Sequence, residues 1–174
     1  MLYEISPEED QLIEAKAKER QANKEAHNVT TKLFDPSKSD YQIHLEGMRA
    51  EFAAAKILDA ELNWQLLVGG DKNAGDLRIK DGRTVSVKFR KKQGWDFALK
   101  SADPKDFREE LGVLVYPSST HFKALNVDRW ISREEFLQKS TMANYGYGDR
   151  LKVSPAKMRP IESLLEEIKL SGLE

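Results

Sequence analysis

The sequence predicts an α/β domain in which helices flank a mixed central β-sheet, and three observations lead to this fold class. A segment at about 43–61 repeats its apolar residues with the period of a helix. A segment at about 76–90 alternates apolar and polar residues around an Asp-Gly turn, which is typical of a β-hairpin. The continuous apolar run at 113–116 is typical of a strand that is buried on both faces. With 174 residues, the chain has the length of one domain with a substantial core.

The composition limits the classes of protein to which the chain can belong. The net charge is −1, so an anion-binding surface has to be a local patch. The absence of cysteine excludes disulfides, cysteine-ligated zinc and thiol nucleophiles. No apolar run approaches the roughly 20 residues of a membrane span, and the N-terminus lacks the pattern of a signal peptide. We therefore expect a cytoplasmic protein that has no membrane partner.

The first expected element is an N-terminal helical arm. Ser6 as N-cap, Pro7 in the first turn and the acidic residues that follow indicate a helix start, and the helix extends to about residue 26. This helix has few apolar residues, so we expect it to pack weakly, as a strut or arm. Turn residues indicate a linker at 28–40. We therefore assign residues 1–40 to the N-terminal helix and linker, and residues 41–174 to the main domain.

The main domain begins with the helix at about 43–61, whose small residues allow it to approach a sheet closely. Its core face consists of Met48, Phe52, Ala55 and Leu58. Strands are expected at about 64–68, 76–80, 83–90, 113–116 and 123–127, with a turn at 69–75. The capping box Ser132-Arg-Glu-Glu135 begins a short helix that ends near residue 139. A loop rich in tyrosine and glycine is expected at 140–151, and Pro160 begins a final amphipathic helix.

The register of the hairpin follows from which residues must share its buried face. The apolar residues that alternate with polar ones on the two strands include Leu77, Ile79, Val85 and Val87. Directly opposed residues of an antiparallel pair share a face, so the connecting loop must contain an odd number of residues. A three-residue loop, Lys80-Asp81-Gly82 with a left-handed glycine, satisfies this condition. The resulting register places Asp76 opposite Ser86 and diagonal to Lys88.

Three residues near this hairpin predict metal-dependent chemistry. Asp76 and Lys88 share a face of the hairpin, and Glu51 lies on the preceding helix, bordering its core face. Taken singly, each has a structural explanation, as a turn aspartate, a solvated strand lysine and an exposed helix glutamate. Taken together, two carboxylates with a backbone carbonyl and substrate phosphate suffice for Mg²⁺, which keeps several waters. Such an ion activates water and polarises a phosphodiester, while a lysine stabilises the charge that develops on the phosphate.

The order of these residues resembles the PD-(D/E)XK nuclease superfamily, especially small phage-encoded members and archaeal-type Holliday junction resolvases. The segment Gly47-x-x-x-Glu51-x-Ala53-x-Ala55 is similar to the family's first helix, and Gly75-Asp76-Leu77 is similar to its metal-binding aspartate. Ser86-Val87-Lys88 stands where the family has (D/E)-x-K. Residues 129–136 resemble a sequence motif that is often found toward the C-terminal end of such phage domains. The resemblance covers roughly residues 40–137.

This resemblance implies a restriction-endonuclease-like core and a Mg²⁺-dependent DNA nuclease, in which Mn²⁺ can substitute for Mg²⁺. It also implies an origin in a phage or a mobile element, and a phage origin would place the protein in the host cytoplasm. The resemblance further implies that Glu51, Asp76 and the carbonyl of Val87 hold the metal and that Lys88 is catalytic.

Ser86 departs from the family pattern, because that position usually holds an acid that ligates the metal. Glu51 can supply the missing charge, as helix glutamates do in many members, and we favour this explanation. An acid from elsewhere is the alternative, either Asp71 from the turn or one of a group after the hairpin whose spacing is unconvincing. That group consists of Asp96, Asp103, Asp106, Glu109 and Glu110.

Basic and aromatic residues around the hairpin are candidates for contact with DNA. They are Arg78, Arg83, Arg90, Lys91, Lys92 and Trp95. A solvated strand end explains the run at 90–92 equally well. His44 lies seven residues before Glu51 on the same helical face, where it either lines the site or is a partly buried structural histidine.

The expected function is therefore metal-dependent hydrolysis of DNA, with two alternatives left open. One is a resolvase-type homodimer that uses the N-terminal helix as a contact arm. The other is a degenerate DNA-binding or partner-binding domain that kept the fold and lost the chemistry at Ser86.

Overall fold

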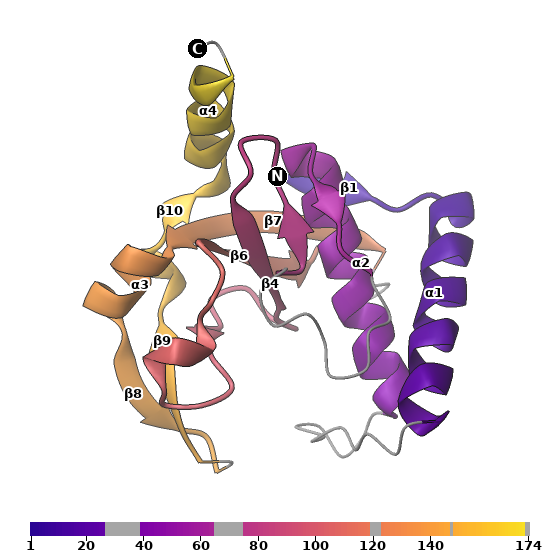
Figure 1. Ribbon diagram of the computed structural model, residues 1–174, viewed down its shortest axis with the longest axis horizontal. Coiled ribbons are helices and arrows are strands. Elements are labelled where there is room, and N and C mark those ends of the chain that lie inside the picture. The colour runs from indigo at the N-terminus through magenta and orange to yellow at the C-terminus, as the bar shows by residue number, and fades with distance from the viewer. Residues whose placement is uncertain (27–38, 65–74, 119–122, 147, 173–174) are drawn as a thin grey trace.

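A curled, mixed β-sheet forms the centre of the molecule, and four helices flank it (Figure 1). The computed structural model describes residues 1–26, 39–64, 75–118, 123–146 and 148–172. The central sheet has the strand order β1-β7-β6-β4-β3-β2, and β10 also pairs with β7. Its strands are β1 (Leu2–Glu4), β2 (Glu61–Leu62), β3 (Leu77–Arg78), β4 (Thr84–Phe89), β6 (Leu111–Pro117), β7 (Ala124–Ser132) and β10 (Arg159–Pro160).

A smaller sheet and the helices complete the described part of the chain. The smaller sheet has the order β5-β9-β8 and consists of β5 (Phe97–Ala98), β8 (Thr141–Asn144) and β9 (Asp149–Val153). The helices are α1 (Pro7–Ala26), α2 (Asp40–Leu58), α3 (Arg133–Lys139) and α4 (Ile161–Ser171), with short 3-10 helices η1 (Pro104–Asp106) and η2 (Pro155–Lys157). None of the helices in these ranges combines the length and apolar character that a bilayer span requires.

The mixed α/β class is confirmed, and its core lies between α2 and the central sheet. Strand β4 pairs in parallel with β6, which agrees with the continuous apolar run expected for a strand buried on both faces. The alanines of α2 are buried at 0–4% exposure, so the helix approaches the sheet as closely as its small residues predicted. Phe52 and Leu58 of α2 join Val85 and Val113 in the same cluster of buried residues.

The register of the hairpin is also confirmed. Leu77 lies opposite Val85 and Arg78 opposite Thr84, so the connecting loop has the three residues 80–82. The N–H of Gly82 donates to the carbonyl oxygen of Ile79 at 2.9 Å, and its φ of 92° is in the left-handed region that favours glycine. Continuing this register places Asp76 opposite Ser86 on the face that they share with Lys88.

Helix α1 differs from the weakly packed arm that its composition suggested. It lies beside α2 in Figure 1, and its Ile13 and Ala17 are fully buried in the main core. The guanidinium of Arg49 on α2 donates two hydrogen bonds to the carboxylate of Asp10, at 2.7 and 3.1 Å. A few buried side chains and one bidentate ion pair are enough to make α1 part of the domain.

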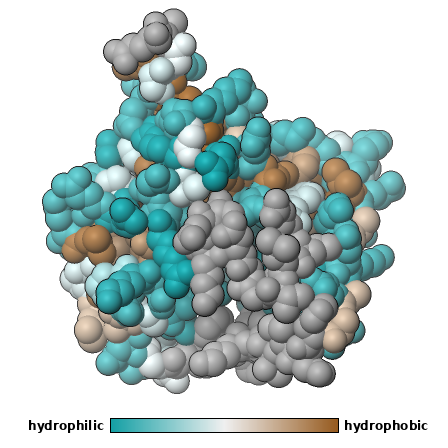
Figure 2. Space-filling view, in the orientation of Figure 1, coloured by the Kyte–Doolittle hydropathy of each residue, from teal (hydrophilic) through white to brown (hydrophobic). Residues whose placement is uncertain are grey.

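Some expected boundaries change in the structure. The expected loop at 140–151 is wrong, because strands β8 and β9 pair there with Met142 opposite Leu151. This small sheet covers a second core cluster that contains three phenylalanine rings. The expected strand at 64–68 and the linker at 28–40 fall largely outside the described residues. The described part of the face in Figure 2 is predominantly hydrophilic, with scattered apolar residues.

Candidate functional site

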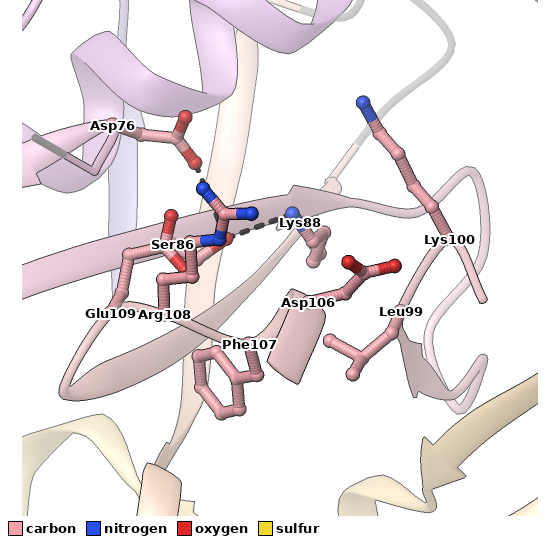
Figure 3. A pocket seen from close by; sticks show the side chains of 9 residues that line it. All are labelled: Asp76, Ser86, Lys88, Leu99, Lys100, Asp106, Phe107, Arg108 and Glu109. Carbon is pink, nitrogen blue, oxygen red and sulfur yellow. Dashed lines mark hydrogen bonds between the residues drawn. The ribbon is translucent and has the colours of Figure 1, made fainter. Parts of the chain in front are cut away.

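A pocket of about 330 Å³ opens beside β4, at the end of the hairpin opposite its turn (Figure 3). Asp76 enters it from just before β3, and Ser86 and Lys88 enter it from β4. The residues that close it come from the segment between β5 and β6. They are Leu99, Lys100, Asp106, Phe107, Arg108 and Glu109. The pocket therefore brings together three of the residues that the sequence singled out for catalysis.

The backbone around Asp76 is held by a residue that sequence analysis missed. The side-chain amide of Asn63 donates to the carbonyl oxygen of Gly75 at 3.0 Å, and its backbone N–H donates to the carbonyl oxygen of Asp76, also at 3.0 Å. Gly75 has a φ of 64°, and a Cβ there would lie 3.1 Å from Cγ of Glu109. A glycine is therefore required for the turn that directs Asp76 into the pocket. No spacing rule in the sequence pointed to Asn63.

A chain of hydrogen bonds links Asp76 to Lys88. Oδ2 of Asp76 accepts from the backbone N–H of Val87 at 2.7 Å and from Oγ of Ser86 at 3.5 Å. The ammonium of Lys88 donates to Oγ of Ser86 at 2.8 Å. Since the N–H and C=O of one strand residue point to the same edge, the carbonyl of Val87 also lies at the edge that Asp76 occupies. Ser86 thus connects the acid and the lysine.

Glu51 on helix α2 lies close enough to Asp76 and Lys88 to interact with their charges, although it does not line the pocket itself. Burial, followed by the negative charge of Asp76, raises the pKa of Glu51 to about 8, while Arg20 and Lys88 act in the opposite direction. The indole N–H of Trp64 donates to Oε2 of Glu51 at 3.2 Å, and the indole stacks on Phe52 with ring centroids 6.0 Å apart. Trp64 therefore orients Glu51, a role that its place in the sequence did not reveal.

The donor set at this site suits Mg²⁺ better than a soft metal. Glu51 and Asp76 offer carboxylate oxygens and Val87 offers a carbonyl oxygen, which are the hard ligands that Mg²⁺ prefers. Within the described residues, no group of three or more His, Cys, Asp or Glu side chains is placed to hold a metal ion. Two carboxylates still fit Mg²⁺, because this ion keeps several of its waters. Burial, followed by the negative charge of Asp76, raises the pKa of Glu51, and a cation bound beside Glu51 would act in the opposite direction and favour the carboxylate.

The acids considered as replacements at position 86 separate into two groups. Asp106 and Glu109 line the pocket, although their spacing in the sequence did not indicate this. The others are engaged elsewhere. Asp96 accepts from Lys152 and Tyr145, Asp103 accepts from the N–H of Lys105, and Glu110 accepts from Thr84. Asp71 lies outside the described residues.

The residues expected to contact DNA do not line the pocket. Arg90 donates to the carbonyl oxygens of Asp96, Phe89 and Ala98 at 2.7, 2.9 and 3.3 Å, so its guanidinium connects β4 to the segment around β5. Arg83 pairs with Asp81 and Glu167, and Arg78 donates to the carbonyl oxygen of Gly82 at the tip of the hairpin. Lys91, Lys92 and Trp95 are exposed. Contact between these exposed residues and DNA stays a prediction.

His44 does not line the pocket. Lys24 donates to its Nε2 at 2.8 Å, because an ammonium group has no acceptor atom. Burial, followed by the charges of Lys24 and Arg20, lowers the pKa of His44 to about 4. The ring is therefore neutral at pH 7, with its proton on Nδ1. This arrangement supports the structural explanation of His44.

No protein-family model matches the chain, and no curated protein shows significant sequence similarity to it.

Proposed function

We propose that the protein is a Mg²⁺-dependent nuclease that hydrolyses phosphodiester bonds in DNA. The observation that supports this proposal most directly is the chain of hydrogen bonds from Asp76 through Ser86 to Lys88 in one pocket, with Glu51 close enough to interact with the charges of both ends. An acid pair and a lysine around a polar pocket provide the groups that phosphodiester hydrolysis needs. The resemblance of the sequence to PD-(D/E)XK nucleases, which depends on these same residues, agrees with this proposal.

Each residue of the site has a role in this proposal. Glu51, Asp76 and the carbonyl of Val87 would hold Mg²⁺, which when bound supplies Lewis-acid activation of water and of the phosphate. Lys88 would position the attacking water and stabilise negative charge on the phosphate oxygens. Ser86 holds the ammonium of Lys88 at 2.8 Å, so its hydroxyl orients the lysine instead of ligating the metal. Trp64 fixes the carboxylate of Glu51.

A second candidate function is DNA binding without hydrolysis. Two observations favour it: a serine stands where the nucleases that the sequence resembles have an acid, and the described residues contain no group of three acidic or histidine ligands. In this case the pocket would bind a phosphate through Lys88 without activating water. Metal binding distinguishes the two functions, because an inactive site should bind Mn²⁺ weakly.

The test compares metal binding and cleavage in matched variants. Mn²⁺ affinity is measured by electron paramagnetic resonance, and cleavage is measured on linear, circular, single-stranded and branched DNA with Mg²⁺ or EDTA. We expect Asp76→Asn and Lys88→Gln to abolish cleavage, and only Asp76→Asn to weaken Mn²⁺ binding strongly. Asp103→Asn is the control, because this exposed residue caps η1 outside the pocket and asparagine is an equally good cap.

Three results would decide against the nuclease. These are a wild type that cleaves none of the DNA substrates, an Asp76→Asn variant that cleaves at the wild-type rate, and a Ser86→Glu variant that gains metal binding absent from the wild type. The last result would support the second function. Preference for branched DNA, together with a dimer in sedimentation, would identify the resolvase-type alternative.

A further inference from the structure

The pocket beside β4 has a second wall, which comes from the segment between β5 and β6 and carries its own charges. Lys100, Asp106, Arg108 and Glu109 line the pocket from this segment. Two carboxylates on this wall would repel a phosphate, and the two cations on the same wall offset them. The roles proposed above involve only the wall that the hairpin forms, so the charged side chains of the second wall take no part in them.

The backbone on both sides of Lys100 is fixed to strand β9. The N–H of Leu99 donates to the carbonyl oxygen of Leu151 at 2.9 Å, and the N–H of Leu151 donates to the carbonyl oxygen of Ser101 at 3.1 Å. One residue of β9 therefore pairs with two positions of the neighbouring segment, and Lys100 is the extra residue between them. An irregular pairing of this kind, like a β-bulge, changes the direction of a side chain and is common next to active sites.

The side chains on this irregular segment have different surroundings. Leu99 is buried and packs in the phenylalanine cluster, whereas Lys100 is exposed at the pocket. Figure 3 shows the side chain of Lys100 extending from its loop, with Lys88 lying between it and Asp76. Within the residues that the structure describes, no hydrogen bond or ion pair holds the ammonium group of Lys100. A ligand in the pocket can therefore reach this group.

A cation at this position suits a phosphate in the pocket. Lys88 donates to Oγ of Ser86 at 2.8 Å, so its ammonium group faces the pocket from the hairpin. Lys100 presents a second ammonium group from the other wall, and a lysine binds a phosphate as a point charge on a flexible stem. A phosphodiester in the pocket would therefore have one lysine from each wall.

We propose that Lys100 is a phosphate-binding residue of the pocket, which holds the DNA backbone from the wall between β5 and β6. This inference rests on the nuclease function proposed above and extends it with a substrate contact that no sequence motif indicated. Because Leu151 fixes the backbone on both sides of Lys100, the smaller sheet becomes part of the structure that binds substrate. The role of Lys100 is to bind the phosphate, whereas Lys88 acts on the reacting atoms.

The test measures DNA binding without cleavage, so that its result does not depend on the activity of the metal-loaded protein. Binding of labelled duplex, single-stranded and branched DNA is followed by fluorescence anisotropy, in EDTA and in Ca²⁺, over a range of salt concentrations. Lys100→Gln is compared with Lys105→Gln, which removes the same charge from an exposed position of η1 that does not line the pocket. Lys100→Arg keeps the charge, and circular dichroism checks that each variant folds.

We expect Lys100→Gln to lower the slope of log affinity against log salt by about 0.9 on duplex DNA, because one phosphate contact is lost. Binding at 0.1 M salt should weaken by roughly 5- to 10-fold. Lys100→Arg should bind nearly as tightly as the wild type, and Lys105→Gln should change little. In cleavage assays with Mg²⁺, Lys100→Gln should raise KM by a similar factor with a much smaller change in kcat, whereas Lys88→Gln should lose kcat.

Failure of the phosphate contact and failure of the nuclease give different results. If the wild type binds and cleaves DNA while Lys100→Gln binds as tightly as the wild type, the phosphate contact is wrong and the nuclease stands. The same conclusion follows if Lys100→Gln and Lys105→Gln weaken binding equally. If Lys100→Gln alone weakens binding and the wild type cleaves no DNA, the contact stands and the nuclease is wrong. A wild type that binds no DNA in either condition would overturn both proposals.

Discussion

A substitution at Gly112 tests whether the packing of the phenylalanine cluster affects the pocket. This glycine lies on β6, directly beside Ser86 in the parallel pair of strands. A Cβ at position 112 would lie 2.4 and 2.6 Å from two ring carbons of Phe97 and 3.1 Å from one of Phe107. Carbon atoms normally approach to about 3.5–4.0 Å, so the substitution Gly112→Ala requires a displacement of about 1 Å.

The rings around Gly112 have little space into which they can move. Phe97 and Phe107 are 0% and 2% exposed, and both contact the buried ring of Phe136, with centroids 5.7 and 5.1 Å away. Overpacking of a core usually costs about 1–3 kcal/mol, and the depth of this overlap places Gly112→Ala toward the upper value. We therefore expect a loss of about 2–3 kcal/mol and a fall in melting temperature of roughly 4–12 °C.

Urea denaturation followed by circular dichroism measures this effect, and Gly47→Ala serves as the matched control. No atom lies within 4 Å of a Cβ at Gly47, which is inside α2, so alanine there should stabilise the protein by about 0.5–1 kcal/mol. The double variant Gly112→Ala/Phe97→Leu should recover part of the lost stability, because the smaller side chain relieves the overlap. Equal or greater stability of Gly112→Ala than wild type would refute the packing argument. Because Phe107 also lines the pocket, we expect cleavage by Gly112→Ala to fall even when the protein is fully folded.

Three further predictions concern single side chains. Burial alone would raise the pKa of Glu135, but hydrogen bonds from groups that include Arg159 lower it to about 2. This folded-state pKa is below the usual value, so the stabilisation is complete above about pH 4.5 and is lost as the pH falls toward 2. Glu135→Gln should lower the free energy of unfolding by about 1–2 kcal/mol at pH 7. At pH 2 the unfolding curve of this variant should approach that of the wild type. A difference in stability that does not depend on pH would argue against the ion pair. Glu51→Gln should weaken Mn²⁺ binding as strongly as Asp76→Asn, since either change leaves one carboxylate, and an unchanged affinity measured by paramagnetic resonance would remove Glu51 from the site. Trp64→Phe should weaken Mn²⁺ binding by roughly 10-fold or more at nearly unchanged stability, because the ring still packs while the donor to Glu51 is lost; wild-type affinity in this variant would show that the indole N–H has no orienting role.

Local patterns in the sequence were sufficient for several parts of this protein. The capping box at Ser132 begins α3 as predicted, because its reciprocal hydrogen bonds involve only residues three apart. The register of the hairpin could be predicted for the same kind of reason. The alternation of apolar residues and the left-handed Gly82 allow one pairing, and that pairing places Asp76 opposite Ser86. These features depend on contacts between neighbours along the chain.

Other parts were decided by contacts between distant segments. The hairpin of β8 and β9 has little apolar alternation of its own, and β9 is held to the rest of the protein because Val153 and Leu151 pack in the phenylalanine cluster, while β8 pairs with β9. Helix α1 likewise has few apolar residues, and its position depends on Arg49, which is 39 residues from its partner Asp10. Propensity and periodicity do not contain this information.

The sequence by itself determined which residue types the candidate site has and which of them share a strand face. Asp76, Ser86 and Lys88 could be placed together because parity along two adjacent strands is a local property. Only the tertiary structure placed Lys100 and Glu109 in the same pocket and set Trp64 against Glu51. Those residues come from segments whose relative positions depend on how the sheet, α2 and the chain between β5 and β6 pack, which is a property of the whole core.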